Sequence, residues 1–299
     1  KTLILVADKK NYFFPYVKSD SVDIENFCRP LGRFEYQLMR LFRRFNISLP
    51  IFFDQWKKKL NKYDKVILFD MGFTPSLAKY TSRKSNAKIF VYLWNPVKGN
   101  SKMIKFISLA KKYAKIFSYD PIDVKNLNLN FAPMVYSKNV SLPKEKEKAD
   151  LSFLGFAKDR LPTLKTLCKD FKKEDITGYF YLVGNSNENL GDIHISTQRK
   201  TYSDYLKMIA STKGILDLVQ GGQSGLSLRV MESLFLKKKL ITANENVANY
   251  DFYSSQNIFI LGKDRISNLK NFLESPIEDI PLSTSSKYEL ESWVNHYFV

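Results

Sequence analysis

The feature that most limits how this chain can fold is a series of short, continuous apolar runs. Examples are residues 2–7, 65–70 and 87–94, each followed by an amphipathic stretch. Continuous apolar strands that alternate with helices are typical of a parallel sheet covered on both faces. The pattern stops at residues 137–150, where Pro143 and a charged run, Lys144–Lys148, replace the apolar periodicity, and it restarts at residue 150.

The two series predict an α/β protein with two Rossmann-like, doubly wound parallel-sheet domains that face a cleft, and the 299-residue length suits two domains. We expect an N-terminal domain over 1–140, a C-terminal domain over 141–285, and a helix in 286–299 that packs back on the N-terminal domain. The expected strands cover 2–7, 65–70, 87–94, 115–119, 131–135, 150–155, 179–183, 214–219, 239–242 and 257–261. The expected helices cover 32–45, 75–83, 101–113, 161–171, 202–211, 226–236 and 288–297.

The positive charge of the chain lies in its first half. Residues 1–149 hold 29 Lys and Arg against 12 Asp and Glu, a net charge of +17, whereas residues 150–299 hold 18 of each. This asymmetry indicates an anionic partner for the first half: a membrane surface, a nucleic acid or an anionic substrate. The alternative is a generically basic surface from a Lys-rich genome, which does not by itself explain a neutral second half.

The two cysteines indicate a reducing compartment. Cys28 and Cys168 are far apart and belong to no motif, so a disulfide framework is not expected. Residues 1–8 have the pattern of a strand and not of a signal peptide, and no apolar run approaches the ~20 residues of a membrane span. We expect a cytoplasmic protein that is at most peripheral on the inner face of the cell membrane.

The glycine-rich segment between the strand at 214–219 and the helix at 226–236 is the most informative for chemistry. Gly221, Gly222 and Gly225 let backbone amides approach a ligand closely, and a helix N-terminus supplies unpaired N–H donors. Arg229 and Glu232 share one helical face and could hold a phosphate oxygen and a hydroxyl pair. The alternative is an i,i+3 salt bridge on an exposed helix.

This segment resembles the nucleotide-sugar motif of GT-B glycosyltransferases that build bacterial surface polysaccharides, such as capsule or lipopolysaccharide. The similar elements are Gln223–Arg229, Met231–Leu234 and Lys238–Thr242. Weaker similarities lie at Asp150–Gly155 with Arg160, at Phe117–Pro121 followed by Phe131–Pro133, and at Tyr288–Trp293. The resemblance covers roughly residues 115–299, whereas the first hundred residues match no motif of the family.

The resemblance implies roles for the matching positions and a metal-independent hexosyltransferase without a cofactor, using a UDP- or dTDP-linked sugar. Glu232 would contact sugar or ribose hydroxyls, Arg229 and the turn would hold the diphosphate, and Gly155 and Arg160 would line the cleft. The metal signature Asp-x-Asp of single-domain glycosyltransferases is missing. The implied donor-binding residues are Gly155, Arg160, Gln220, Gly222, Gln223, Ser224, Gly225, Arg229 and Glu232.

An inverting enzyme also needs a base in the N-terminal domain to deprotonate the acceptor hydroxyl. The candidates stand at strand ends: Asp70 first, then Asp8 and Asp120. A turn-forming aspartate that caps the next helix is the alternative for each of them. A retaining enzyme would need no such base, and the sequence leaves the stereochemistry open.

The expected acceptor is an oligosaccharide or a lipid-linked glycan, so the basic half could rest on an anionic membrane. The alternative is that its aromatic residues form the core and its charges a solvated face. Two other functions are a basic nucleic-acid-binding protein, for which no helix-turn-helix, RNP or zinc pattern is found, and a non-catalytic nucleotide-binding protein. Nucleic acid is therefore not expected as a partner. The residues considered for the membrane are Arg40, Arg43, Arg44 and Lys57–Lys59, with Phe42, Phe45, Phe52, Phe53 and Trp56.

Overall fold

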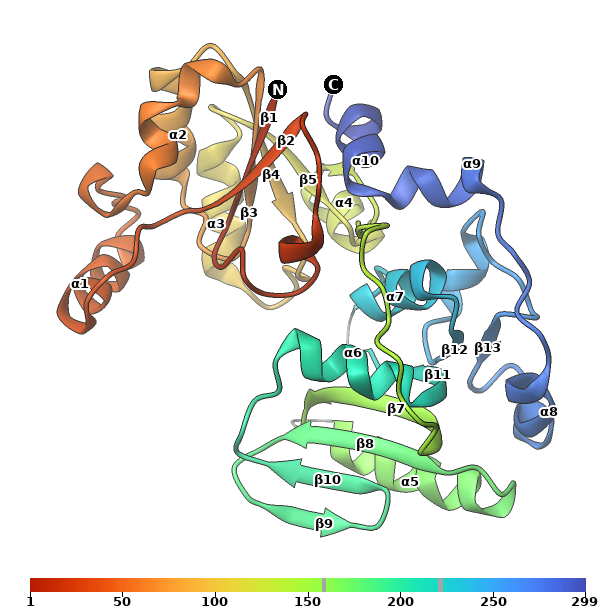
Figure 1. The fold of residues 1–299 in the computed structure, drawn as a ribbon. Helices are drawn as coiled ribbons and strands as arrows, with labels where there is room; N and C mark the ends of the chain where they lie inside the picture. The colour runs from red at the N-terminus through yellow and green to blue at the C-terminus, as the bar shows by residue number, and fades with distance from the viewer. Residues whose placement is uncertain (158–159, 220–222) are drawn as a thin grey trace. The chain divides into compact units, whose positions relative to one another are not determined.

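The computed structural model describes residues 1–157, 160–219 and 223–299 and divides the chain into two compact units. Unit 1 contains Lys1–Met134 together with Leu290–Val299, and unit 2 contains Val135–Glu289. Each unit is built on a mainly parallel sheet with helices packed against it (Figure 1). The prediction of two Rossmann-like α/β domains is therefore confirmed.

The sheet of unit 1 has six described strands, all parallel, in the order β2-β1-β3-β4-β5-β6. Strands β1, β3, β4 and β5 are almost wholly buried, because their apolar side chains point into the layers of structure on both faces of the sheet. The strands are β1 (Thr2–Val6), β2 (Val22–Asn26), β3 (Lys65–Phe69), β4 (Lys88–Leu93), β5 (Lys115–Ser118) and β6 (Asn130–Phe131).

The helices of unit 1 begin at local capping signals. Thr74 caps α2 by accepting a hydrogen bond from the Leu77 amide, and Asn100 caps α3 by accepting one from the Met103 amide. The helices are α1 (Arg33–Arg44), α2 (Pro75–Lys84), α3 (Ser101–Ala110), α4 (Pro121–Leu127) and α10 (Leu290–Tyr297), with 3₁₀ helices η1 (Phe14–Tyr16), η2 (Pro50–Phe52), η3 (Gln55–Lys58) and η4 (Leu60–Lys62).

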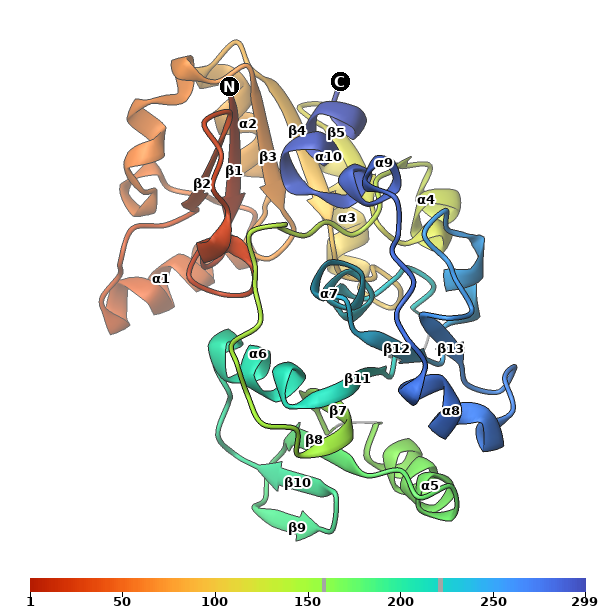
Figure 2. The same cartoon turned by 45° about the vertical axis from the view of Figure 1, so that its right-hand side comes forward.

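The last helix, α10, packs on the sheet of unit 1, beside β4 and β5 in both views (Figures 1 and 2). The buried Trp293 indole donates a hydrogen bond to the Pro133 carbonyl over 2.9 Å. The ring of Phe298, just after the helix, lies 5.4 Å from the ring of Phe90 and 4.6 Å from that of Phe117. Segments from both ends of the chain therefore share one apolar core.

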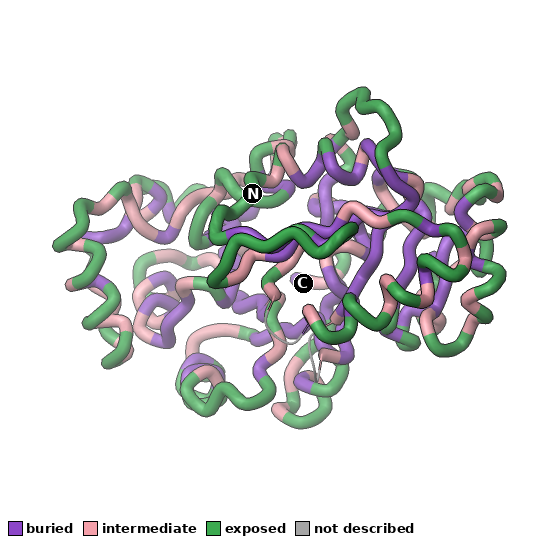
Figure 3. Tube along the Cα trace, turned by 90° about the horizontal axis from the view of Figure 1, so that it is seen from below, coloured by how far each residue is buried: buried purple, intermediate pink, exposed green. Residues whose placement is uncertain are grey.

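The sheet of unit 2 has seven described strands in the order β13-β12-β11-β7-β8-β10-β9, and only the pair β9–β10 is antiparallel. Figure 3 colours each residue by burial, and most residues of the strands in both units are buried. The strands are β7 (Ala149–Phe156), β8 (Gly178–Val183), β9 (Glu188–Leu190), β10 (Ile193–Ser196), β11 (Thr212–Asp217), β12 (Lys239–Thr242) and β13 (Ile258–Ile260). The helices are α5 (Arg160–Lys173), α6 (Tyr202–Ala210), α7 (Leu228–Leu236), α8 (Leu269–Glu274) and α9 (Leu282–Ser285), with η5 (Glu245–Asn249), η6 (Ile266–Asn268) and η7 (Ser286–Tyr288).

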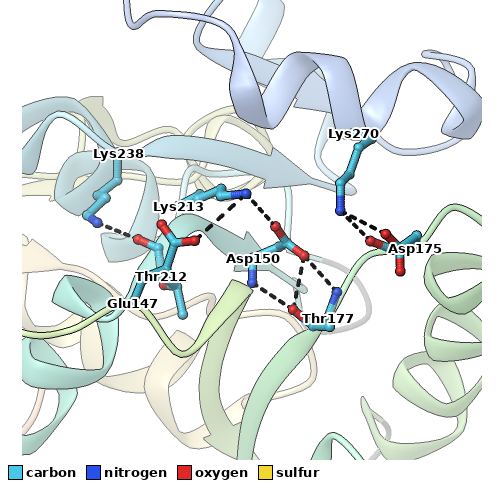
Figure 4. A network of polar contacts seen from close by, with 8 residues as sticks. All are labelled: Glu147, Asp150, Asp175, Thr177, Thr212, Lys213, Lys238 and Lys270. Carbon is cyan, nitrogen blue, oxygen red and sulfur yellow. Dashed lines mark hydrogen bonds and ion pairs between the residues drawn. The ribbon is translucent and has the colours of Figure 1, made fainter.

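A polar network joins the strands of unit 2 where β7, β8 and β11 begin (Figure 4). The Asp150 carboxylate accepts hydrogen bonds from the amide and hydroxyl of Thr177, at 2.9 and 3.0 Å, and from Lys213 Nζ at 2.9 Å. Burial alone would raise the pKa of Asp150, but these donors outweigh it and lower the pKa. The network stabilises the amino ends of the strands, opposite the edge where the candidate site lies.

The structure corrects several sequence-based predictions. The strand expected over 131–135 ends at Phe131, because Pro133 has no N–H to donate to a neighbouring strand. Strand β2, the pair β9 and β10, and helix α4 were not predicted. The polar sequence of β2 contains no apolar run, and Pro121 stands in the first turn of α4.

Some of the aromatic residues considered for a membrane surface are buried, and others are exposed. Phe52, Phe53 and Trp56 are buried in unit 1, so the alternative that they form the core is correct for these three, whereas Phe45 is 70% exposed. Among the described residues, no helix has the length and apolar content needed to cross a bilayer.

Candidate functional site

The candidate site of unit 2 lies where β11 ends and α7 begins, at the carboxyl ends of the parallel strands. Ser227 caps α7: its hydroxyl accepts a hydrogen bond from the Arg229 amide and donates one to Asp217 Oδ1 over 2.7 Å. Asp217, the last residue of β11, is fully buried, and its Oδ2 accepts a hydrogen bond from the Thr242 hydroxyl at the end of β12. Asp217 thus ties the start of α7 to two neighbouring strands.

The Arg229 guanidinium contacts Leu154 and Asp217, and its Nε–H has no hydrogen-bond partner among the described residues. Its Nη2 donates to the Leu154 carbonyl over 2.5 Å, and its Nη1 lies 3.5 Å from Asp217 Oδ1. The guanidinium carbon lies 4.7 Å from the centre of the Phe153 ring. The Nε atom is buried and has no hydrogen-bond partner among the described residues. An orphaned, buried N–H beside a helix N-terminus is what a site for an anionic group requires.

Arg160 reaches the same place from the start of α5. Its Nε donates to the Leu218 carbonyl over 3.1 Å, and its guanidinium carbon lies 5.9 Å from the centre of the Phe153 ring. A Cβ added to Gly155 would lie 2.9 Å from the Phe153 ring and 3.5 Å from Arg160 Nη1, so a glycine is needed for this close approach. The structure therefore brings Gly155, Arg160 and Arg229 together around Phe153.

Glu232 is placed differently from the other predicted donor-binding residues. Its carboxyl is buried, and its two oxygens accept hydrogen bonds from the hydroxyls of Tyr202, over 3.0 Å, and Tyr205, over 2.9 Å. Burial raises the pKa of Glu232 to about 7, although Arg229 and the two tyrosines act to lower it. Among the described residues, Arg229 forms its ion pair with Asp217 and not with Glu232.

This placement decides how Glu232 can be tested. Glu232→Ala would leave the buried Tyr205 hydroxyl without its acceptor, which costs about 1–3 kcal/mol. Such a variant would report on stability as well as on ligand binding. Glu232→Gln keeps the size of the side chain and one acceptor oxygen, so it is the better substitution.

The turn before α7 is fixed from the neighbouring loop. The carbonyls of Ser224 and Gly225 both accept hydrogen bonds from Asn244 Nδ2, at 3.3 and 3.2 Å. The Gln223 side chain donates to the Gly225 carbonyl over 3.1 Å. Two other predicted donor-binding residues, Gln220 and Gly222, lie outside the described residues.

The three candidate bases of unit 1 have very different environments. Asp70 follows β3 and is buried, and its oxygens accept hydrogen bonds from the amide and the side chain of Asn95 at 3.0–3.2 Å. Burial raises the pKa of Asp70 to about 7, although the Asn95 donors act to lower it. Asp120 caps α4 through the Ile122 amide. Asp8 is exposed and accepts hydrogen bonds from Lys10 and Asn11.

The pKa of Asp70, about 7, is the value that suits a general base at neutral pH. Asp120 has the structural role of a helix cap, the alternative that the sequence had left open for each candidate.

Several residues of the site were not predicted from the sequence. They are Asp217, Thr242 and Asn244, at the ends of β11 and β12, and the tyrosines Tyr202 and Tyr205 of α6. A signal was present for Asp217, which stands in the same strand-to-helix segment as Arg229, and for Thr242, which ends the similar element Lys238–Thr242. The tyrosines lie on another helix, and only the tertiary structure brings them to Glu232.

No family model matches the chain, and no curated protein sequence matches it. Among solved structures, TarM is similar with a TM-score of 0.46 and 13% identity, over 81% of this chain and 54% of TarM. The Glycosylation Associate Protein complex from Streptococcus agalactiae is similar with a TM-score of 0.41 and 12% identity, over 81% of this chain and 53% of the other. CalG4, the calicheamicin glycosyltransferase, gives a TM-score of 0.35 and 9% identity, over 89% of this chain and 80% of CalG4.

The chain thus spans about half the length of TarM and of the Streptococcus protein. Similarities at these TM-scores and identities carry no inference about activity. The assignment of the fold rests on the strand order of the two sheets themselves.

Proposed function

We propose that the chain is a glycosyltransferase that moves a sugar from a nucleotide-sugar donor to a glycan acceptor in bacterial surface polysaccharide assembly. The observation that carries the proposal is the convergence of Arg160 and Arg229 on Phe153, beside the capped N-terminus of α7. Two guanidinium groups at the carboxyl edge of a parallel sheet suit a diphosphate, because both carry positive charge and the Arg229 Nε–H has no partner among the described residues. The donor is a UDP- or dTDP-linked hexose in this proposal, and no metal is needed to hold it.

In the proposed reaction, Asp70 takes the proton of the acceptor hydroxyl. The hydroxyl oxygen forms a bond to the anomeric carbon while the bond from that carbon to the diphosphate oxygen breaks. The diphosphate leaves with the electron pair, and Arg160 and Arg229 stabilise the negative charge that it gains. The pKa of about 7 supports Asp70 as the base, because a large fraction of the group is then ionised at neutral pH and still basic enough to accept a proton.

Donor binding gives the first test. We expect one UDP- or dTDP-sugar to raise the melting temperature of the full chain, since a ligand at a hundred times its Kd stabilises the folded state by about 2.7 kcal/mol. Arg229→Lys should remove most of this shift, because a lysine has no N–H at the position of Arg229 Nε. Arg265→Lys, at an exposed arginine of the same unit, is the control and should keep the shift.

The same experiment separates the alternative functions. A nucleic-acid-binding protein would bind DNA or RNA with a steep salt dependence and would ignore nucleotide sugars. A non-catalytic protein would bind the nucleotide without releasing a nucleoside diphosphate from the donor. If no nucleoside diphosphate or nucleotide sugar changes the melting temperature, the donor site in unit 2 is wrong.

We further propose that unit 1 rests on an anionic membrane through α1. Phe34, Leu41 and Phe45 form one exposed stripe along this helix, with Phe34 78% and Phe45 70% exposed. Arg33, Arg40 and Arg44 are exposed on the flank of the stripe and form no ion pair with any described residue. An apolar stripe flanked by unpaired cations is the pattern of a helix that lies in the surface of an anionic bilayer. A lipid-linked acceptor would be available at such a surface.

Vesicle sedimentation tests this surface. The protein should bind phosphatidylglycerol vesicles and not phosphatidylcholine vesicles, and Phe34→Ser with Phe45→Ser should weaken the binding at least tenfold, because each buried Phe contributes roughly 1.5–3 kcal/mol. Leu282→Ser, at an apolar residue of unit 2 that is 84% exposed, is the control. If the double variant binds the vesicles as well as the unchanged protein does, the α1 stripe is not the membrane-binding surface. If the unchanged protein forms a dimer and the double variant does not, the stripe binds a second copy of the chain instead.

A further inference from the structure

A cluster of aromatic rings lies at the carboxyl ends of β1, β3 and β4, three neighbouring strands of unit 1. Tyr12 stands in the loop after β1, Phe69 is the last residue of β3, and Trp94 directly follows β4. Strands β2 and β3 lie on the two sides of β1, so the strand order changes direction at this point. In open parallel sheets, ligands bind outside the carboxyl ends of the strands at such a change of direction.

The buried rings of the cluster fix the rings that reach solvent. Phe14 and Phe69 are buried. The Trp94 ring is stacked on that of Phe14, with ring centres 5.6 Å apart, and meets that of Phe69 edge to face at 5.3 Å. The Tyr12 ring meets that of Trp94 edge to face at 5.2 Å. Tyr12 is 40% exposed and Trp94 is partly exposed, so two rings with fixed positions are accessible to a ligand.

The backbone of Tyr12 indicates that its ring is kept for more than packing. Its φ is +55°, in the left-handed region that disfavours a bulky side chain. Of the five described non-glycine residues with a positive φ, two are Asn and one is Asp, which tolerate this region, and Tyr12 is the one aromatic residue. Because 40% of Tyr12 is exposed, its contacts within unit 1 use only part of the ring. A strained residue of this kind is typical of a functional site.

The cluster is continuous with the surroundings of Asp70. Asn95 follows Trp94 in the sequence, and its amide and side chain donate hydrogen bonds to the Asp70 carboxylate at 3.0–3.2 Å. Asp70 itself follows Phe69, and the next residue, Met71, is 46% exposed. A ligand on the exposed rings therefore lies at the same strand ends as the proposed base.

We propose that Tyr12 and Trp94 form a subsite that binds the pyranose ring of the acceptor. The C–H groups of a sugar ring carry partial positive charge and pack on the electron-rich faces of aromatic rings. Asp8 and Asn11, exposed in the same loop as Tyr12, offer polar groups for the hydroxyls. The word acceptor rests on the function proposed above. The inference adds that the acceptor presents a sugar ring at this surface, and not only a lipid or a phosphate.

Quenching of tryptophan fluorescence by acrylamide tests the subsite in the full chain without any donor. Trp56 and Trp293 are 2% and 0% exposed, so among the three tryptophans the quencher reaches mainly Trp94. We expect at least one of three probes, the methyl glycosides of glucose, galactose and N-acetylglucosamine, to lower the quenching at millimolar concentration. Sorbitol has the hydroxyls of a hexose without a ring and should leave the quenching unchanged.

Tyr12→Asn should raise the Kd for the protecting glycoside roughly three- to tenfold, the loss expected for one stacked aromatic ring. Asparagine suits a φ of +55°, so this variant should keep its melting temperature. Tyr12→Phe retains the ring and should retain the Kd. Tyr36→Asn, at a tyrosine of α1 that is 51% exposed, is the matched control and should also bind the glycoside normally.

The proposal is overturned if none of the three glycosides lowers the quenching, or if sorbitol lowers it equally. It is also overturned if Tyr12→Asn binds the glycoside as the unchanged protein does and has a lower melting temperature, because the ring then has a purely structural role. Protection of Trp94 and the stabilisation of the chain by a nucleotide sugar are separate results. The subsite and the proposed function can therefore fail independently.

Discussion

Arg229→Ala is expected to lower the free energy of unfolding by about 3 kcal/mol, because it leaves a fully buried carboxylate without its cation. Asp217 would keep its hydrogen bonds from Ser227 and Thr242 but would lose the positive charge 3.5 Å away. The Leu154 carbonyl would lose a donor as well. Urea unfolding at pH 7, followed by circular dichroism, measures the effect.

A double-mutant cycle with Asp217→Asn supplies the control for this expectation. If the two side chains interact, the double variant is less destabilised than the sum of the two single changes. Coupling below about 0.5 kcal/mol would show that the pair is not coupled. Donor binding should be lost in Arg229→Ala even under conditions in which the variant remains folded.

Asp70→Asn is expected to reduce the rate of sugar transfer by a factor of about 10² to 10⁴, the usual contribution of a general base. In the unchanged protein the rate should rise with pH up to about 7 and then level, because the base must be ionised and its pKa is about 7. Asp120→Asn keeps the cap of α4 and should retain activity. Loss of activity in Asp120→Asn and not in Asp70→Asn would move the role of base to Asp120.

The same pKa predicts how stability depends on pH. The folded protein binds the Asp70 proton more tightly than the unfolded chain, whose aspartate has a pKa near 3.8. Stability is therefore highest below about pH 4 for this group and falls as the pH rises to about 7, by on the order of 4 kcal/mol. Asp70→Asn should flatten this part of the profile, and Glu232, whose pKa is also about 7, should account for a further fall.

The parts of the fold that the sequence predicts are those in which one local pattern decides the structure. The central strands β3 and β4 are buried on both faces, so each is a nearly continuous apolar run. Edge strand β2 has only one fully buried residue, Val22, and its acidic and polar residues resemble a loop. Strand β9 is wholly exposed, so hydropathy carried no signal for it.

The candidate site could be predicted where its residues are neighbours in the sequence. The turn and Arg229 are continuous with β11, so their common position followed from the strand-turn-helix pattern. The burial of Glu232 could not be predicted, because it depends on two tyrosines some thirty residues earlier in the chain.

The position of α10 has a consequence for how the protein is made. Unit 1 needs residues 1–134 and residues 290–299 for its core, and the whole of unit 2 lies between them in the chain. During translation, residues 290–299 of unit 1 therefore leave the ribosome only after the whole of unit 2 has emerged. Until then the apolar surfaces of Phe90 and Phe117, which Phe298 covers in the finished protein, stay open. Of the two units, unit 1 is thus begun before unit 2 and completed after it.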